Sequence, residues 1–126
     1  MNEIDVFVRY AAAFEVAYAS DDWSAVRDFF TDDAVYEVEA SPPFGGTWKG
    51  RNVIVDHLIE SVNAFDRTYD ERALEILSPP TTKDGAVHVR WGGVYRKAGQ
   101  DDLRVEGEEY AWIRDGKIAR LKDIMP

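Results

Sequence analysis

The chain has 126 residues, 45% hydrophobic and 13% aromatic, which is the composition of one folded domain over residues 1–126. Its net charge of -9 argues against nucleic acids and anionic membranes as partners, because both attract basic clusters. It has no cysteine, which excludes disulfides, thiolate nucleophiles and thiolate metal ligands. With no apolar run of membrane-spanning length and an acidic start, MNEIDVF, we expect a cytoplasmic protein.

The first half of the chain predicts three helices and one strand. Apolar residues recur at three-and-four spacing in the helical segments, and they alternate with polar residues in the strand. Asn52 is the expected N-cap of the third helix, and Pro and Gly mark the loop before it, which carries Phe44 and Trp48. The expected elements are a helix over Glu3–Ser20, a short helix over Trp23–Phe30, a strand over Ala34–Glu39, a loop over Ser41–Gly50 and a helix over Val53–Phe65.

The second half predicts only strands. A strand over about Thr68–Leu77 is followed by a loop through Pro79-Pro80 and a long strand over Ala86–Lys97. The segment Leu103–Pro126 then predicts a hairpin that turns at Asp115-Gly116. Helices gathered before an antiparallel sheet indicate an α+β fold. We expect a curved, mostly antiparallel sheet wrapped round the three helices, with a conical cavity on its concave face.

One acid stands on each otherwise apolar face of the terminal hairpin. Glu109 shares a face with Val105, Ala111 and Ile113, and Asp123 shares one with Ala119, Leu121 and Met125. Burying an ionised carboxylate is costly, so these acids either reach solvent at the sheet ends or line a cavity and act there. A slip of one residue in the register would turn Glu108 inward instead of Glu109. The opposite face carries the apolar residues Tyr110, Trp112, Ile118 and Ile124.

Three segments resemble the nuclear transport factor 2-like superfamily, in particular its SnoaL-like and ketosteroid-isomerase-like branches. They are FFTDDAVYE after the second helix, GTWKGRNVI at the entry to the third, and RDGKIARLKD in the hairpin. The resemblance extends over essentially the whole chain and implies the cone-shaped α+β fold. It does not imply one activity, because the superfamily includes isomerases, cyclases, dehydratases, epoxide hydrolases and binding proteins.

Residue by residue, the resemblance favours one acid. The ketosteroid-isomerase oxyanion-hole tyrosine falls on Phe14 and the catalytic base on Val38, so we reject that constellation, although its second acid falls near Glu109. The segment LKDIMP is similar to the one that carries the catalytic acid of limonene-epoxide hydrolase, and Asp123 is the match. SnoaL-like polyketide cyclases have an acid at the same place. Tyr36 matches a water-binding tyrosine of the hydrolase.

We therefore expect Asp123 to be the general base or acid, with His57, on the inward stripe of its helix, as proton partner. A protonated Glu109 or a tyrosine would polarise the substrate oxygen. Each has a structural alternative: a core histidine, or acids paired with Arg90, Arg120 or Lys122. The expected pocket lining consists of Phe14, Tyr18, Tyr36, Val38, Trp48, Trp91 and Leu121.

Two functional hypotheses follow from these residues. The first is cofactor-free acid–base chemistry (isomerisation, cyclisation, dehydration or hydrolysis) on a small hydrophobic carbonyl or hydroxyl compound. The second is a non-catalytic ligand-binding or assembly module. The spacing of the histidines and acids predicts no metal site, and we expect no cofactor. The apolar residues on the outer face of the last strands predict a homodimer with Trp112 near the centre of its interface.

Overall fold

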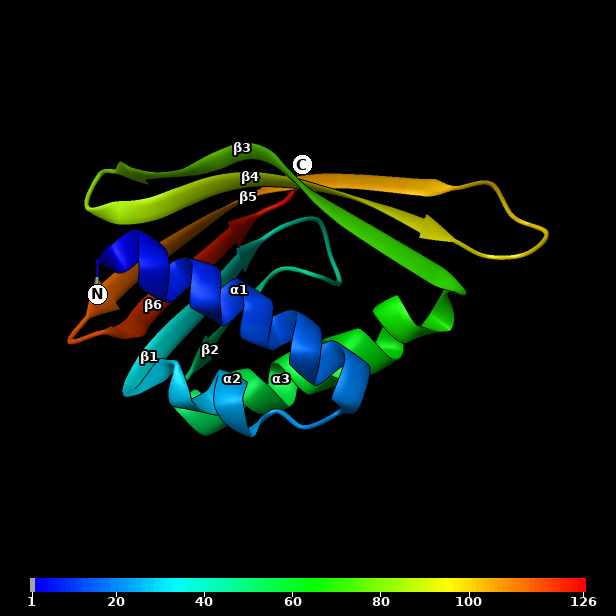
Figure 1. The fold of residues 1–126 in the computed structure, drawn as a ribbon. Coiled ribbons are helices and arrows are strands. Elements are labelled where there is room, and N and C mark those ends of the chain that lie inside the picture. The colour runs from blue at the N-terminus through cyan, green and yellow to red at the C-terminus, as the bar shows by residue number, and fades with distance from the viewer. Residues whose placement is uncertain (1) are drawn as a thin grey trace.

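The computed structural model describes residues 2–126 as one curved sheet with its helices on one side (Figure 1). The helices are α1 (Glu3–Ser20), α2 (Ser24–Asp28) and α3 (Arg51–Ala64), with a 3-10 turn at Asp66–Thr68. The strands are β1 (Phe30–Glu39), β2 (Gly46–Lys49), β3 (Glu71–Lys83), β4 (Ala86–Arg96), β5 (Leu103–Arg114) and β6 (Lys117–Ile124). The predicted α+β fold is confirmed.

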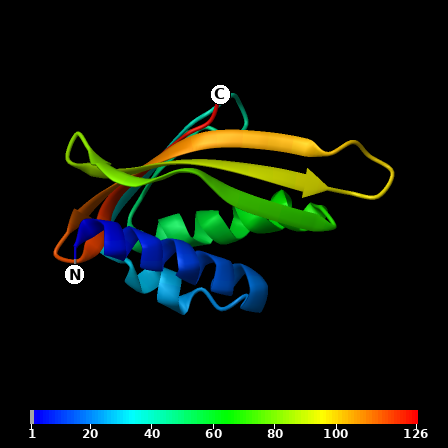
Figure 2. The same cartoon turned by 45° about the horizontal axis from the view of Figure 1, so that its top comes forward.

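The sheet order is β2-β1-β6-β5-β4-β3, and only β1 and β6 run parallel. The helices cover its concave face, while the β4–β5 end projects beyond them (Figure 2). The β5–β6 hairpin turns at Asp115 and Gly116, which have positive φ values of 54° and 76°. Such a turn matches the twist of the strands that it joins, as the Asp-Gly pair predicted. This order puts the last strand in the middle of the sheet.

Several predicted elements have different bounds. The second helix ends at Asp28, and β1 already begins at Phe30 because Thr31–Asp33 extends the strand. The predicted loop Ser41–Gly50 contains β2, which pairs with β1. Asn52 does not cap α3, whose N-cap is Gly50. Pro79 and Pro80 lie within β3, where an edge position and two register shifts tolerate the missing N–H groups.

The core fills the deep part of the concave face. Strand residues Val38, Val87, Ala111 and Leu121 are each no more than 7% exposed, and they pack against buried residues of α1 and α3. Apolar side chains therefore occupy much of the space that the sequence predicted as a conical cavity. The helix residues of this core are Phe7, Tyr10, Ala17, Val26, Ile54, Val55, Leu58 and Val62.

Ile118 was wrongly predicted on the outer face. It is fully buried in the core, because the β5–β6 register shifts between Trp112 and Ile113. Such a bulge turns the following side chain toward the other face of the sheet. The outer face therefore has one apolar residue fewer than predicted.

Gly107 permits a close approach that shapes the concave face. We expect Gly107→Ala to lower the free energy of unfolding by about 1–3 kcal/mol, the usual range for overpacking. An added Cβ would lie 2.8 Å from the Trp91 indole and 3.0 Å from the Ile124 carbonyl oxygen. Gly92→Ala is the matched control, since its Cβ would meet only the Leu77 side chain, at 3.3 Å. Urea denaturation measures the free energy of unfolding of both variants. If the two variants lose the same amount, the Trp91–Gly107 contact is not tight.

Candidate active site

Two carboxyl groups face each other on the last two strands. Antiparallel pairing places Glu109 of β5 directly opposite Asp123 of β6. Side chains alternate along a strand, so Asp123 shares the concave face with Leu121, and both are buried. Asp123 is 9% exposed, whereas Glu109 is half-buried and reaches solvent. Glu108 points to the outer face, where its Oε1 lies 2.9 Å from His88 Nε2, so the register places Glu109 inward.

Tyr36 holds Asp123 from the neighbouring strand β1. The parallel β1–β6 register pairs Val38 with Asp123 and Tyr36 with Leu121, which brings the Tyr36 side chain beside the acid. Tyr36 Oη donates a hydrogen bond to Asp123 Oδ2 at 2.5 Å. Asp123 Oδ1 is also buried, and with both acids ionised it has no donor among residues 2–126. A proton shared with the Glu109 carboxyl supplies that donor, which explains how the pair tolerates burial.

The environment of the pair acts differently on the pKa values of its two acids. Burial, and then the charge of Asp123, raises the pKa of Glu109 well above its usual value. Burial also raises the pKa of Asp123, but hydrogen bonds from Glu109 and Tyr36 oppose that increase. The two carboxyl groups therefore titrate as a pair, and burial favours keeping one proton between them. A protonated acid beside an ionised one is the arrangement that acid–base chemistry requires.

Tyr10 is the polar neighbour that the sequence analysis missed. It lies on α1, is 4% exposed, and belongs to the core. Its pKa is raised well above the usual value by burial and then by the charges of Glu109 and Asp123, which places its hydroxyl near the pair. The apolar stripe that the sequence predicts on α1 contains Phe7, which is as buried as Tyr10, and four residues that are less buried: Ile4, Ala11, Phe14 and Tyr18. Tyr10 stands three residues after Phe7, so the same periodicity also fitted it.

His57 lies beside the carboxyl pair without contacting it. Its ring stacks on Trp48 with centroids 3.5 Å apart and planes 14° from parallel, and it lies 5.9 Å from the Tyr36 ring. Its Nε2 is 3.4 Å from Ser61 Oγ. Burial lowers the pKa of His57, an effect that Glu60 opposes. His57 therefore neighbours Tyr36, which contacts Asp123, and forms no hydrogen bond or ion pair with either acid among the described residues.

The predicted lining residues divide into two groups. Tyr36 contacts Asp123, Trp48 lies 5.8 Å from the Tyr36 ring, and the Trp91 indole lies over Gly107, on the face that Glu109 occupies. The others have structural contacts. Val38 and Leu121 are core residues, Phe14 packs edge-on against Trp23 at 5.2 Å, and Tyr18 lies under the Arg72 guanidinium at 4.2 Å.

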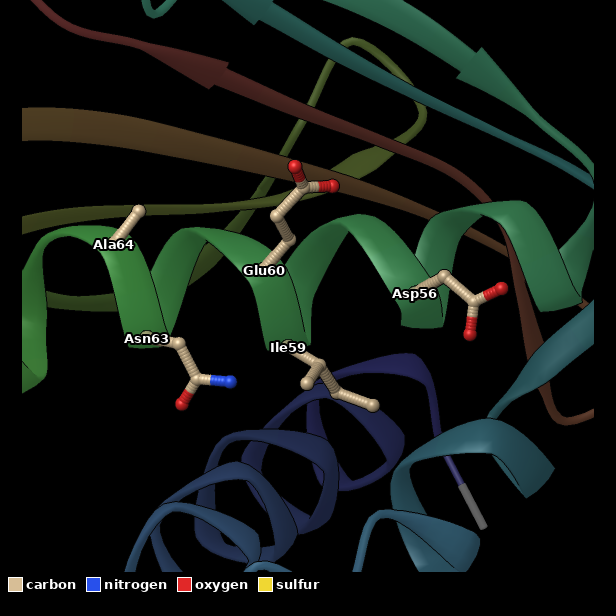
Figure 3. Close-up of a pocket in the computed structure, with 5 residues that line it drawn as sticks. All are labelled: Asp56, Ile59, Glu60, Asn63 and Ala64. Carbon is tan, nitrogen blue, oxygen red and sulfur yellow. The ribbon is translucent and has the colours of Figure 1, made fainter.

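A shallow pocket lies on α3 (Figure 3). Figure 3 shows its five labelled side chains fanning out from the helix, with Ile59 and Asn63 directed toward α1. None of these five is a member of the carboxyl pair or one of the residues that contact it; they are Asp56, Ile59, Glu60, Asn63 and Ala64. Within residues 2–126 no three His, Asp or Glu side chains converge as metal ligands would, and no helix of the described chain is long and apolar enough to cross a membrane.

Sequence comparison identifies one family. The model of the SnoaL-like domain matches residues 9–121, a span that begins within α1, includes Tyr36, His57 and Glu109, and ends two residues before Asp123. No curated protein sequence matches the chain. The family match agrees with the resemblance found in the sequence.

Solved structures share the fold at low sequence identity. An NTF2-like protein from Anabaena variabilis has a TM-score of 0.73 and 15% identity, covering 98% of this chain and 89% of its own. An NTF2-like protein from Exiguobacterium has a TM-score of 0.69 and 16% identity, covering 96% of this chain and 98% of its own. A protein from Catenulispora acidiphila with a ketosteroid isomerase-like fold, in complex with trimethylamine, has a TM-score of 0.64 and 16% identity. The match covers 90% of this chain and 82% of that protein. At these identities the likeness shows the fold alone.

The raised pKa of Glu109 makes stability depend on pH. The folded pair keeps a proton that the unfolded carboxyl, with a usual pKa of 4.5, has already lost. As pH rises above 4.5 toward the raised pKa, the free energy of unfolding should fall by up to about 1.4 kcal/mol per pH unit. Glu109→Gln should flatten this slope, because the amide cannot ionise and keeps a donor. Urea titrations at several pH values measure the slope.

The control for this titration is Glu106→Gln, which changes an exposed acid on the outer face of the same strand. It should keep the wild-type slope. An unchanged slope in Glu109→Gln would show that Glu109 does not retain the proton.

Proposed function

We propose that this chain, which belongs to the SnoaL-like domain family, binds a small, largely apolar molecule and performs cofactor-free acid–base chemistry on it. The observation that carries the proposal is that Asp123 and Glu109 lie opposite each other on the concave face, with Tyr36 hydrogen-bonded to Asp123. The reaction classes that such a pair serves are isomerisation, cyclisation, dehydration and hydrolysis. The substrate would be a carbonyl or hydroxyl compound.

Asp123 is the proposed general base. It carries the negative charge of the pair, and burial raises its pKa toward the range in which a carboxylate accepts a substrate proton efficiently. Glu109 is the proposed acid, because it holds the proton and reaches solvent. A proton removed by Asp123 and one delivered by Glu109 leave the pair with the same total number of protons, so a substrate can be isomerised without a cofactor. Tyr36 is a positioning residue, since its hydroxyl is bonded to Asp123.

His57 has a secondary role in this proposal. Its lowered pKa keeps the imidazole neutral near pH 7, the form that can accept a proton. The stack with Trp48 fixes its ring, and it neighbours Tyr36, which contacts Asp123. His57 would exchange protons with a substrate or with water, and Trp48 and Trp91 would provide apolar contact surface.

A non-catalytic binding module is the second candidate. The observation that favours it is the packing of the concave face, whose deep part is filled by core side chains such as Val89 and Leu121. In that case the carboxyl pair would orient a ligand without transforming it. Retained binding without turnover distinguishes this function from catalysis.

The test is a screen of hydrophobic ketones, lactones and epoxides with product detection, followed by Asp123→Asn. We expect the variant to fold and to lose turnover by on the order of 10²–10⁴-fold, the usual loss for a missing catalytic base. His57→Phe should lower activity less, because the apolar ring can keep the contact with Trp48. An Asp123→Asn variant with full activity would make Asp123 structural.

We also propose that the chain forms a homodimer through the outer face of the sheet. Tyr110 and Trp112 of β5 stack there with ring centroids 6.0 Å apart, and the Arg120 guanidinium lies 4.5 Å from the Trp112 ring centroid. Ile124 is half-buried on this face, and Glu37 pairs with Arg120 beside it. Aromatic residues ringed by both signs of charge suit a two-fold contact, in which an acid of one copy meets a base of the other.

Sedimentation of the wild type and of Trp112→Glu tests this interface. The wild type should sediment as a dimer, and the variant should shift to monomer because it places a carboxylate at the centre of the contact. The control is Glu106→Gln, which changes an exposed residue on the same outer face and should remain dimeric. A monomeric wild type would refute the proposal.

A further inference from the structure

The buried carboxyl pair has no cationic partner. In the described part of the chain, neither Glu109 nor Asp123 takes part in an ion pair with Lys, Arg or His. The basic residues of β6 face the other way: Arg120 pairs with Glu37, and Lys122 pairs with Glu39, on the outer face. Buried charges are normally paired, so a positive charge is missing from the concave side of this strand.

The groups that surround the pair offer hydrogen bonds and ring faces but no cation. Tyr36 approaches from β1 and is bonded to Asp123 Oδ2, and Tyr10 approaches from α1. His57 of α3 lies beside the Tyr36 ring, and burial lowers its pKa, so it is neutral. The only donor available to Asp123 Oδ1 within the described residues is the shared proton. A hydrogen-bond donor of a ligand can take the place of that proton.

The same groups are suited to an organic cation. Aromatic faces attract ammonium groups, and Tyr36 and Trp48 contribute two rings with centroids 5.8 Å apart. Trp91 lies over Gly107 on the face that carries Glu109. Glu109 and Trp91 are half-buried, so each side chain keeps some contact with solvent. The net charge of -9 adds a long-range attraction for cations.

We propose that the carboxyl pair binds small apolar molecules that carry a protonated amine, with the ammonium group replacing the shared proton. The N–H groups donate to Asp123 Oδ1 and to Glu109, both acids become ionised, and the displaced proton leaves to solvent. The positive charge that the concave face lacks is then supplied by the ligand. This binding uses the same pair as the proposed catalysis but does not require turnover.

Calorimetry with two isosteric probes tests the proposal. Cyclohexylmethylamine and cyclohexylmethanol have the same apolar ring, and only the amine is charged at pH 7. Titrations of each in two buffers of different ionisation enthalpy give the number of protons released on binding. The amine should bind at least tenfold more tightly than the alcohol and should release close to one proton, while the alcohol should release none.

Two variants assign the released proton. Glu109→Gln retains a hydrogen-bond donor toward Asp123 and should fold. Because its amide has no acidic proton to lose, proton release should disappear. Amine affinity should fall at least tenfold. Glu106→Gln, on the outer face of the same strand, should behave as the wild type. The proposal is overturned if the amine binds no better than the alcohol, if binding releases no proton, or if neither probe binds. Turnover of neutral substrates would survive each of these results, so they leave the catalytic proposal to its own test.

Discussion

The hydrogen-bonded contact among Asp123, Glu109 and Tyr36 is the constraint on which the concave face depends. Two acids buried side by side would repel each other if both were ionised, and each would lose its hydration. The pair is stable because one proton remains and because the Tyr36 hydroxyl donates to Asp123. Any ligand of this site must either preserve that proton or supply an equivalent positive group. The chemistry of the site and its ligand preference therefore have the same origin.

Strand β6 carries ion-paired basic residues on its outer face and an acid without a cationic partner on its inner face. Its outward residues Arg120 and Lys122 form ion pairs with Glu37 and Glu39 of β1, in which all four side chains remain partly exposed. Its inward residue Asp123 has no cation and shares a proton instead. The central position of β6, between β1 and β5, brings Tyr36 to one side of Asp123 and Glu109 to the other. A strand at the sheet edge would supply only one of these contacts.

Irregular backbone adapts the sheet to its helices. The register shift between Trp112 and Ile113 turns Ile118 into the core, opposite Phe30 of β1, and seals the deep end of the concave face. At the other end, Arg72 of β3 joins Glu15 of α1 and Asp66 of the 3-10 turn. The two ends are thus closed by different means, apolar packing at one and an ion-pair network at the other. The carboxyl pair lies between them.

The sequence by itself determined the α+β class, the hairpin at Asp115-Gly116 and the two acids on apolar strand faces, because strand alternation and turn chemistry are local properties. Only the tertiary structure decided how these residues meet. The bulge that buries Ile118, the position of Tyr10 near the acids and the burial of Tyr18 under Arg72 depend on contacts between segments far apart in the chain. The hydrogen bond from Tyr36 to Asp123 joins residues 87 positions apart, through a parallel strand pairing that no local pattern encodes.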